Sequence, residues 1–387
     1  MRRLAAGASL IDVNIDYDVL VVGSGIVGLG HALAAHDDGL RVILIDRDAR
    51  PVGASVRNFG HVCATGQSRE LRELALGTRE RWLSVAARTG LPIRQSAGAA
   101  VARAADEVAV MEELADKRDA VELRTAAQIR ADLGGVVADD VVGGARLHDD
   151  LRVDPRTTAP RLADWLGNRD GVEFRWRTAY LGIEEADATG ARVRTSGGAI
   201  AAGRVFVCVG HDLDYLAPAV ADDAGMERCA LQMMLTEDPG IRVPPAVLTA
   251  TSLLRYDAFA ETSAAAALRT RLELRRPELF AADTNIMFTQ RPDGGLLIGD
   301  SHRNRLTVSP FLDESVSALI LGEVEAVLGR RLRIRERWQG VYAARPAGPY
   351  LTARLAPNVH ACSVTTGVGM TVGLELAARS LAGTLTS

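Results

Sequence analysis

The first strong pattern in the chain is an apolar run, a glycine-rich turn and a helix, followed by another apolar run. Residues 17–22 read YDVLVV, which is β-branched and apolar over the length of one strand. Residues 23–28 read GSGIVG, and the helical stretch LGHALAAHDDG leads to a second apolar run, RVILID, that ends at Asp46. This order predicts a strand–helix–strand unit with parallel strands.

The glycine turn has the spacing G-x-G-x-x-G of a dinucleotide-binding site. In such a turn Gly23 allows the tight bend, Gly25 lets the backbone approach a pyrophosphate, and Gly28 lets helix and strand pack closely. The helix N-terminus offers unpaired N–H groups and a positive dipole to phosphates. Asp46 follows the first glycine by 46 − 23 = 23 residues, near the roughly 20 expected of a ribose-binding acid. This acid disfavours NADP and leaves FAD and NAD open.

Beyond this unit the pattern no longer repeats strand and helix regularly. A long helical region follows Gly60, and Asp154 with Pro155 is typical of a helix start. Residues 191–210 predict a hairpin that turns at 196–198, and residues 226–335 predict antiparallel strands with flanking helices. A second glycine turn, TGVGMT at 366–371, leads into the last helix. We therefore expect an α/β protein in which a Rossmann-like domain is joined to a domain with a mixed or antiparallel sheet.

Composition narrows the class of protein. Of the 387 residues, 48% are hydrophobic and 24% charged, as in soluble globular proteins, and no apolar run is long enough to span a bilayer. Residues 1–16 begin like a signal peptide, but acidic residues interrupt the apolar stretch. We therefore expect a flexible N-terminal leader instead of a signal peptide. The net charge of −4 shows no basic stripe, which makes nucleic acid an unlikely partner.

The cysteines and the lysine content also constrain the chemistry. Cys63, Cys208, Cys229 and Cys362 are scattered without a CxxC pair, which predicts buried thiols in a reducing cytoplasm and neither disulfide nor metal site. Lys117 is the single lysine of the chain. A lysine base or Schiff base is therefore almost excluded.

Taken together, these motifs resemble the D-amino-acid oxidase, glycine oxidase and sarcosine oxidase superfamily of flavoproteins over nearly the whole chain. The resemblance is carried by YDVLVVGSGIVGLG, Asp46, VDPRTTAPRL, RVFVCVG, RPDGGLLIGD, ERWQGVY and TTGVGMTVGLELA. Within the superfamily, GASVRNFG, CALQMMLT, LLIGDSH and RWQGVY resemble a bacterial branch associated with phosphonate metabolism. The resemblance implies a discontinuous FAD domain (17–85, 149–225 and 336–387) and a substrate domain (86–148 and 226–335) whose sheet covers the flavin ring.

The resemblance also implies that residues 53–61, GASVRNFGH, run beneath the flavin ring. Arg57 and Asn58 would then donate to the flavin or its phosphates, whereas the plainer alternative is a solvated loop. Some relatives attach FAD through a histidine in this loop, where this chain has Arg57, and others through a cysteine after the RWQG-like segment, where none occurs. We therefore expect non-covalent FAD. The expected cofactor-binding residues are Gly23, Ser24, Gly25, Ile26, Val27, Gly28, Asp46, Arg47, Ser55, Arg57, Asn58, Phe59, Gly60, Ala179, Gly210, Thr366, Gly367, Val368, Gly369, Met370 and Thr371.

The substrate side departs from the superfamily pattern. Amino-acid oxidases of this group place an arginine two residues after the glycine that matches Gly340, where it pairs with the substrate carboxylate, and this chain has Tyr342 there. Arg345, Tyr342, His61 and His302 are the candidate catalytic residues. Packing for Tyr342 and a surface position for Arg345 are the plainer alternatives. The departure favours a small anionic amine, such as an aminophosphonate or its N-methyl derivative, over an ordinary α-amino acid.

The activity that the resemblance implies is transfer of a hydride equivalent from the amine-bearing carbon to flavin N5, followed by imine hydrolysis. O₂ or another acceptor would reoxidise the flavin, and with Lys117 as the only lysine, histidine or arginine would have to assist O₂. The alternatives are a glycine- or sarcosine-type oxidase that binds its carboxylate through Arg345, an NAD-dependent dehydrogenase, and a flavin-bound scaffold without activity. The oligomeric state stays open.

Overall fold

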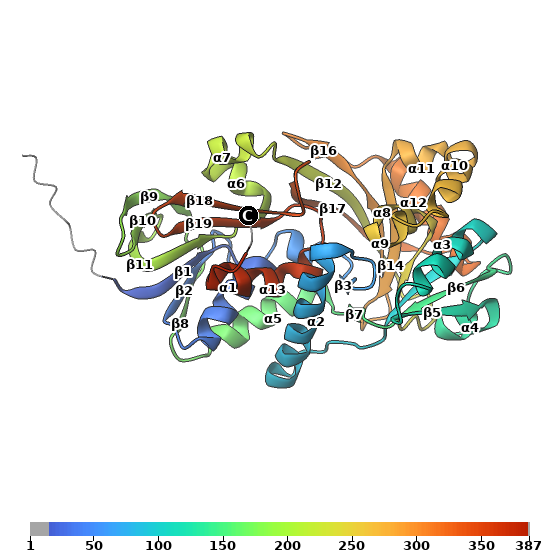
Figure 1. The fold of residues 1–387 in the computed structure, drawn as a ribbon, viewed down its shortest axis with the longest axis horizontal. Coiled ribbons are helices and arrows are strands. Elements are labelled where there is room, and N and C mark those ends of the chain that lie inside the picture. The colour runs from blue at the N-terminus through green and yellow to red at the C-terminus, as the bar shows by residue number, and fades with distance from the viewer. Residues whose placement is uncertain (1–14, 386–387) are drawn as a thin grey trace, which may run out of the picture.

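The structure is a computed structural model that describes residues 15–385. The chain forms two lobes side by side, each built on its own large sheet (Figure 1). The expected leader, residues 1–16, lies outside the described part of the chain except for its last two residues. None of the helices within residues 15–385 is long and apolar enough to cross a membrane.

The first sheet is built around β1 (Tyr17–Val22), which pairs in parallel with β2 (Val42–Ile45) and with β11 (Gly198–Val207). The strand order is β18-β19-β11-β1-β2-β8, and the hairpin strands β9 and β10 extend from β11. The remaining strands of this sheet are β8 (Val172–Arg175), β9 (Tyr180–Ala186), β10 (Ala191–Thr195), β18 (Tyr350–Ala356) and β19 (Val359–Val364). The predicted strand–helix–strand unit and the predicted hairpin are thus confirmed.

Four helices pack against one face of this sheet (Figure 1). They are α1 (Ile26–Asp37), α2 (Arg69–Thr89), α5 (Pro155–Gly167) and α13 (Gly369–Ala382). Helix α5 begins as predicted, because the Asp154 carboxylate accepts a hydrogen bond from the Arg156 N–H at 3.2 Å and Pro155 occupies the first helical position. Trp82 of α2 is fully buried and donates its indole N–H to the Met370 carbonyl of α13 at 3.0 Å, which ties these two helices together. On the opposite face lie α6 (Leu213–Leu216) and α7 (Pro218–Asp223).

The second sheet has the order β16-β12-β15-β14-β13-β4-β6-β5, with β17 also paired to β12. All of its neighbours are antiparallel except β13 and β4, which confirms the predicted mixed or antiparallel sheet. Its strands are β4 (Gly98–Ala102), β5 (Val121–Thr125), β6 (Gly143–Leu147), β12 (Glu227–Thr236), β13 (Ala246–Leu248), β14 (Thr284–Gln290), β15 (Leu296–Ser301), β16 (Arg303–Arg305) and β17 (Ile334–Ala344).

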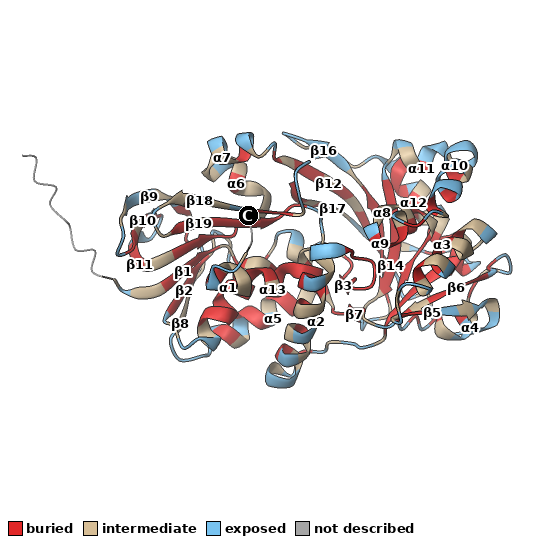
Figure 2. Cartoon of the chain, in the orientation of Figure 1, coloured by how far each residue is buried: buried red, intermediate tan, exposed pale blue. Residues whose placement is uncertain are grey.

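Helices cover both faces of the second sheet, and most of its strands are buried between them, whereas β5 and β16 are largely exposed (Figure 2). One face packs against α3 (Ala105–Ala115), α8 (Ala250–Arg255), α9 (Asp257–Ala260) and α10 (Ala265–Arg275). The other packs against α4 (Ala126–Asp132), α11 (Pro277–Ala281) and α12 (Glu314–Leu328). Phe59, from the first lobe, packs with the α8 face, so this face is the one turned toward the first lobe.

The chain crosses between the lobes several times. The predicted domain boundary between residues 335 and 336 falls inside β17, which pairs with β12 along its whole length, so the chain returns to the first sheet only at β18. A two-stranded ladder of β3 (His61–Val62) and β7 (Leu151–Arg152) lies between the two large sheets in sequence and in space (Figure 1).

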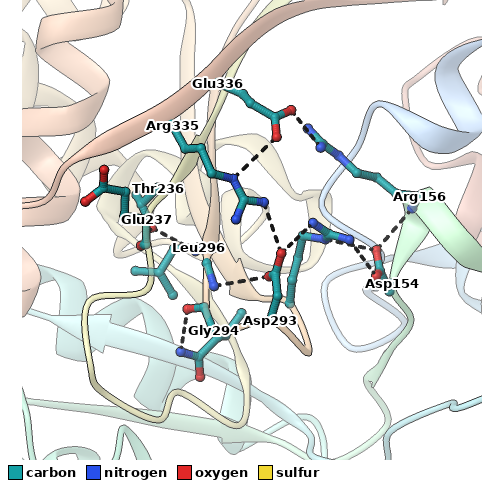
Figure 3. Close-up of polar contacts among 12 residues, drawn as sticks. Asp154, Arg156, Thr236, Glu237, Asp293, Gly294, Leu296, Arg335 and Glu336 are labelled. Carbon is teal, nitrogen blue, oxygen red and sulfur yellow. Dashed lines mark hydrogen bonds and ion pairs between the residues drawn. The ribbon is translucent and has the colours of Figure 1, made fainter.

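An ion-pair network also connects the lobes (Figure 3). Arg291 pairs with Asp154 at the start of α5 at 3.2 Å and with Asp293 in the β14–β15 turn at 3.0 Å. Arg335 of β17 pairs with the same Asp293 at 3.0 Å, and Glu336 receives Arg156 at 2.8 Å. Each of these side chains therefore has an opposite charge within reach. We call this group the β17 ion-pair network.

Candidate active site

A cavity of about 410 Å³ runs from the first glycine turn to the edge of the second sheet. Its walls come from segments far apart in the sequence that the fold brings together: the β1–α1 turn, the end of β2, the loop after it, the end of β11, β17 and the second glycine turn. Among the expected cofactor-binding residues, those that line it are Gly23, Ser24, Gly25, Ile26, Val27, Asp46, Arg47, Ser55, Arg57, Asn58, Ala179, Gly210, Gly367, Gly369 and Met370.

The first glycine turn has the geometry that its spacing predicts. Gly23 has φ of 101°, in the region that glycine adopts without steric cost. A Cβ on Gly28 would lie 1.9 Å from the Gly23 carbonyl oxygen, so only glycine fits where α1 packs on the turn. Helix α1 begins at Gly25 without a side-chain cap, and the Ile26 N–H donates to the Ser55 hydroxyl at 2.8 Å. The N–H groups of this helix end are thus directed at the cavity wall.

The second glycine turn brings another helix end to the same cavity. Gly367 has φ of 76°, and a Cβ there would lie 3.0 Å from the Tyr342 ring. Helix α13 begins after Val368, again without a side-chain cap in this part of the structure. Two helix N-termini therefore face one long cavity, an arrangement that suits a ligand with negatively charged or electron-rich groups at both ends. This arrangement fits a dinucleotide such as FAD.

The carboxylate of Asp46 lies at the cavity edge, at the end of β2. One of its oxygens accepts a hydrogen bond from the Ser24 N–H at 2.7 Å and the other from the Asp48 N–H at 2.8 Å. These contacts orient the carboxylate beside the glycine turn, at the position expected for contact with a ribose.

The loop at residues 53–61 supports the cavity mainly through its backbone contacts. Arg57 donates to the Val52 carbonyl at 2.8 Å and to the Gln339 carbonyl of β17 at 3.3 Å. Asn58 accepts from the Gly60 N–H at 2.7 Å. At Gly60 a Cβ would lie 2.0 Å from the Val153 carbonyl oxygen, so its close backbone approach is to the chain itself.

Six of the expected cofactor-binding residues stand behind the lining instead of in it. Phe59 packs toward the second sheet, where a Cβ on Gly299 would lie 3.4 Å from its ring. The Thr371 hydroxyl accepts from the Cys63 N–H at 3.1 Å. These contacts position the walls of the cavity. The six residues are Gly28, Phe59, Gly60, Thr366, Val368 and Thr371.

His61 is enclosed and does not belong to the cavity lining. Its Nε2 lies 2.8 Å from the Asp150 carboxylate, whose other oxygen accepts from the Thr65 N–H at 2.8 Å. The Cys63 thiol completes a buried group whose polar atoms lie within 4.8 Å of one another. Burial and then the Asp150 charge raise the pKa of that thiol. Sequence spacing could not have revealed this group, because Asp150 is remote in the chain.

Of the candidate catalytic residues, Tyr342 alone lines the cavity. Its hydroxyl lies 3.3 Å from a guanidinium nitrogen of Arg255, the last residue of α8. Burial raises the pKa of Tyr342 well above its ordinary value, so the phenol stays protonated. Arg255 was not among the residues predicted from the sequence, because nothing in LLRYD marks it and only the packing of α8 across the sheet brings it to β17.

Arg345 lies away from the cavity in the described structure. Its guanidinium donates to the Tyr350 carbonyl oxygen, and its buried Nε has no partner among the described residues. The side chain thus braces the connection from β17 to β18.

His302 follows β15 and lies beside the same group of side chains as Arg255. Its Nδ1 lies 2.9 Å from the Asp283 carbonyl oxygen, so Nδ1 carries the hydrogen and Nε2 the lone pair. Burial, and then the Arg255 charge, lower the pKa of His302 to about 3. The ring is therefore neutral at ordinary pH and faces Tyr342 edge-on at 6.3 Å between ring centres.

The four cysteines, all within the described residues, are free and buried, which confirms the prediction of ordinary thiols. Lys117 pairs with Glu113 of α3 at 2.9 Å and is 58% exposed, so it lies on the surface, in the turn after α3.

Solved structures of similar fold cover almost the whole chain. Glycine oxidase from Geobacillus kaustophilus superposes with a TM-score of 0.75 at 16% identity, over 96% of both chains. Iminodiacetate oxidase from Chelativorans sp. BNC1 gives 0.73 at 17% identity, over 95% of this chain and 94% of the other. L-α-Glycerophosphate oxidase from Mycoplasma pneumoniae, solved with FAD bound, gives 0.71 at 14% identity, over 95% and 94%.

At these identities the likeness to solved structures establishes the fold. No curated protein sequence matches the chain significantly. A protein-family model described as "FAD dependent oxidoreductase" (DAO) matches residues 18–382. This match spans both lobes, both glycine turns and β17, and it agrees with a cavity that presents two helix N-termini to one ligand. The chain therefore belongs to the DAO family of FAD-dependent oxidoreductases.

Proposed function

We propose that this FAD-dependent oxidoreductase oxidises the C–N bond of a small amine that also carries an anionic group, and that this group is a phosphonate. The observation that carries the proposal is the contact between Tyr342, which lines the cavity, and Arg255, whose guanidinium lies 3.3 Å from the Tyr342 hydroxyl. Where amino-acid oxidases of the resembling superfamily have an arginine, this chain presents a phenol, and the cation arrives from α8.

With the tyrosine on β17 and the arginine on α8, the site can bind a different kind of anion. An arginine on β17 would present its guanidinium in one plane to a planar carboxylate, in the two-point geometry that such pairs adopt. Here the donors are a neutral hydroxyl on β17 and a guanidinium on α8, 3.3 Å apart. Hydrogen-bond donors on two elements match the oxygens of a tetrahedral anion better than those of a flat one.

The substrates named for the solved structures of similar fold support a substrate that carries either a carboxylate or a phosphorus-containing anion. Glycine and iminodiacetate, named in two of these enzymes, carry carboxylates, and glycerophosphate, named in the third, carries a phosphate. Enzymes with this architecture thus act on substrates with either kind of anion. The side chains at the site, and not the fold, set the choice.

The residues of this chain have distinct tasks in the proposed reaction. When bound, FAD supplies the oxidising power, as acceptor of a hydride equivalent. The first glycine turn and Asp46 would hold its ribose and pyrophosphate, the second glycine turn would contact its other end, and Tyr342 with Arg255 would orient the anion of the substrate. Phe59 packs against the second sheet behind the cavity wall, where it would help to hold that wall in place.

An anaerobic flavin-reduction screen tests this proposal. Glycine, sarcosine, aminomethylphosphonate, 2-aminoethylphosphonate and its N-methyl derivative are mixed with the purified yellow protein, and the loss of flavin absorbance is followed. We expect aminophosphonates to bleach the flavin at lower concentration than the carboxylates. Reduction by the carboxylates alone would refute the phosphonate assignment and leave a glycine- or sarcosine-type oxidase. No reduction by any amine would refute the proposed activity itself.

A further inference from the structure

A buried carboxylate without a hydrogen-bond partner lies next to the proposed anion site. Asp300 is the fifth residue of β15, and its side chain is 5% exposed. Its Oδ1 has no partner among the described residues. A buried polar atom left unpaired is costly and calls for an explanation.

The position of Asp300 connects it to both halves of the site. Its neighbour Gly299 lies against Phe59, which belongs to the loop that follows the FAD-binding unit. A Cβ on Gly299 would lie 3.4 Å from the Phe59 ring. The Arg255 charge acts on Asp300 directly, and Arg255 in turn reaches the hydroxyl of Tyr342 in the cavity wall. Arg255 and Asp300 thus lie beside Tyr342, the one of these three residues that lines the cavity.

The groups that face Asp300 compensate for its burial only in part. His302 presents a neutral Nε2 lone pair at 3.9 Å, which cannot donate to a carboxylate. Burial raises the pKa of Asp300 to about 8, and Arg255 and the Asn285 amide offset this only in part. The titratable or charged groups that face it from the packed elements are Arg255, Tyr256, Asp283, His302, Cys229 and Tyr342.

We infer that Asp300 binds the ammonium group of the substrate and takes its proton, while Arg255 and Tyr342 hold the anion. This inference rests on the proposed function, because it assigns the two ends of a zwitterionic amine to two opposite charges. An ammonium nitrogen has no free electron pair and cannot be oxidised until it loses a proton. In the proposed step one N–H bond of the ammonium breaks, its electron pair stays on nitrogen, and the proton forms an O–H bond with Asp300.

Other proton acceptors are occupied or remote. His61 is paired with Asp150 and lies outside the cavity lining. The Nε2 of His302 lies 3.9 Å from Asp300. Lys117 lies on the surface with Glu113. Asp300 is the buried carboxylate beside Arg255. An ammonium group would give its unpaired Oδ1 the hydrogen bond that the protein itself does not supply.

Proton release on ligand binding tests the assignment without turnover. The ligand is (2-amino-2-methylpropyl)phosphonate, whose amine-bearing carbon has no hydrogen to lose, and propylphosphonate is the amine-free match. Calorimetric titration at pH 7 in buffers of different ionisation enthalpy gives the protons released per ligand bound. Because Asp300 is largely protonated before binding and ionised beside an ammonium, the amine should release close to one proton more than propylphosphonate does.

Three variants separate the outcomes. Asp300→Asn should abolish this extra proton and weaken binding of the amine about tenfold or more, with little change for propylphosphonate. Asp300→Glu should restore part of the extra proton. Asp293→Asn, the same change in the β17 ion-pair network, should behave as the unchanged protein. Flavin absorbance verifies that each variant is folded and loaded, and Asp300→Ser replaces the Asn variant if that variant does not retain FAD.

The results distinguish failure of this inference from failure of the proposed function. An extra proton that persists in Asp300→Asn, or an unchanged pH profile of anaerobic flavin reduction in that variant, overturns the role of Asp300 while the enzyme remains an amine oxidase. If no anionic amine binds to the unchanged protein or reduces its flavin, the proposed function fails and the role of Asp300 fails with it.

Discussion

Two groups of charged side chains on the second sheet differ in how their charges are paired. In the β17 ion-pair network, Asp293 receives Arg291 and Arg335, each at 3.0 Å, and Glu336 receives Arg156 at 2.8 Å (Figure 3). Around Arg255 the contacts are long or missing. Arg255 lies 3.4 Å from the exposed Asp283 carboxylate, and Asp300 has an oxygen with no partner among the described residues.

The difference teaches which group the fold uses for itself. A paired network at the surface is nearly neutral for stability and holds the lobes in register. A buried carboxylate that lacks partners costs free energy in the folded state, so a protein that keeps one has a use for it. Perturbed and unpaired groups of this kind gather at functional sites. We therefore assign structural work to the first group and ligand work to the second.

The largest expected effect comes from removal of the cation of the second group. In Arg255→Met, the anion of the substrate loses its charged partner, which costs about 2–5 kcal/mol for a close charge pair. The concentration of anionic amine that half-reduces the flavin under anaerobic conditions should therefore rise about 30-fold or more. Titration of flavin absorbance with 2-aminoethylphosphonate measures this change.

Arg331→Met is the matched control for that experiment. Arg331 is 94% exposed and pairs with Glu325 at 2.8 Å, whereas the Arg255 side chain is largely buried. Its replacement should leave the titration unchanged. If Arg255→Met binds the amine as tightly as the unchanged protein, Arg255 is not the anion partner and the contrast between the two groups loses its functional meaning.

The next effect concerns stability and its pH dependence at Asp300. The pKa is about 8 in the folded protein and 3.8 in an unperturbed aspartate, so between about pH 4 and pH 8 the unfolded chain ionises this carboxyl while the folded protein keeps it protonated. This term makes the folded protein less stable as the pH rises through that window and levels off above it. Asp300→Asn cannot ionise and should escape the loss.

Thermal unfolding of the FAD-loaded proteins without substrate measures this difference. The melting temperature of Asp300→Asn relative to the unchanged protein should rise steadily from pH 5 to pH 8. The pKa difference sets an upper limit of about 6 kcal/mol. A melting-temperature difference that is constant over this range would show that Asp300 is not held neutral by burial.

Arg345 provides a smaller and different effect. Its guanidinium donates to the Tyr350 carbonyl oxygen, so Arg345→Met should lower the free energy of unfolding by about 1–3 kcal/mol, the usual range for a hydrogen bond from a charged group. The amine concentration for half-reduction should stay within about twofold. If instead the affinity for glycine or sarcosine falls sharply while the melting temperature holds, Arg345 binds a carboxylate, as in the alternative derived from the sequence.

The two glycine turns could be predicted from the sequence because their geometry depends on local chemistry. The Gly23–Gly28 turn, Asp46 and the Gly367–Gly369 turn each announce themselves within a few residues, since a pyrophosphate and a helix end need glycine and a fixed spacing. The same local rules predicted the start of α5 at Asp154. Position along the chain was enough here, because these features depend on backbone conformation.

The substrate side could not be predicted in the same way. Arg255 reaches Tyr342 across 87 residues of sequence separation, and Asp300 lies on a third element, β15, so only the assembled fold shows the group. His61 and His302 were attractive as single residues. The fold, however, pairs His61 with the Asp150 carboxylate and His302 with the Asp283 carbonyl oxygen. A polar residue in a motif does not reveal which partner the fold gives it.

The smallest effect, and the sharpest test of the contrast, is the same substitution in the paired group. Asp293→Asn removes one negative charge between Arg291 and Arg335 but keeps the turn, because the remaining oxygen still accepts from the Gly295 N–H at 3.3 Å. Partly exposed pairs of this kind contribute about 0.2–1 kcal/mol each, and screening reduces them. The melting temperature should fall slightly in 50 mM salt and less in 500 mM salt, with half-reduction by the amine unchanged.

The pair of aspartate variants then decides whether charge pairing separates the two groups. Both lose one carboxylate charge to an amide of nearly the same size, so any difference between them comes from their surroundings. Asp293→Asn should destabilise at every pH, whereas Asp300→Asn should stabilise the protein increasingly toward pH 8 and impair amine binding. If Asp293→Asn impairs amine binding as strongly, the substitution acts through the relative placement of the lobes, and unpaired charge no longer distinguishes the active site from its supports.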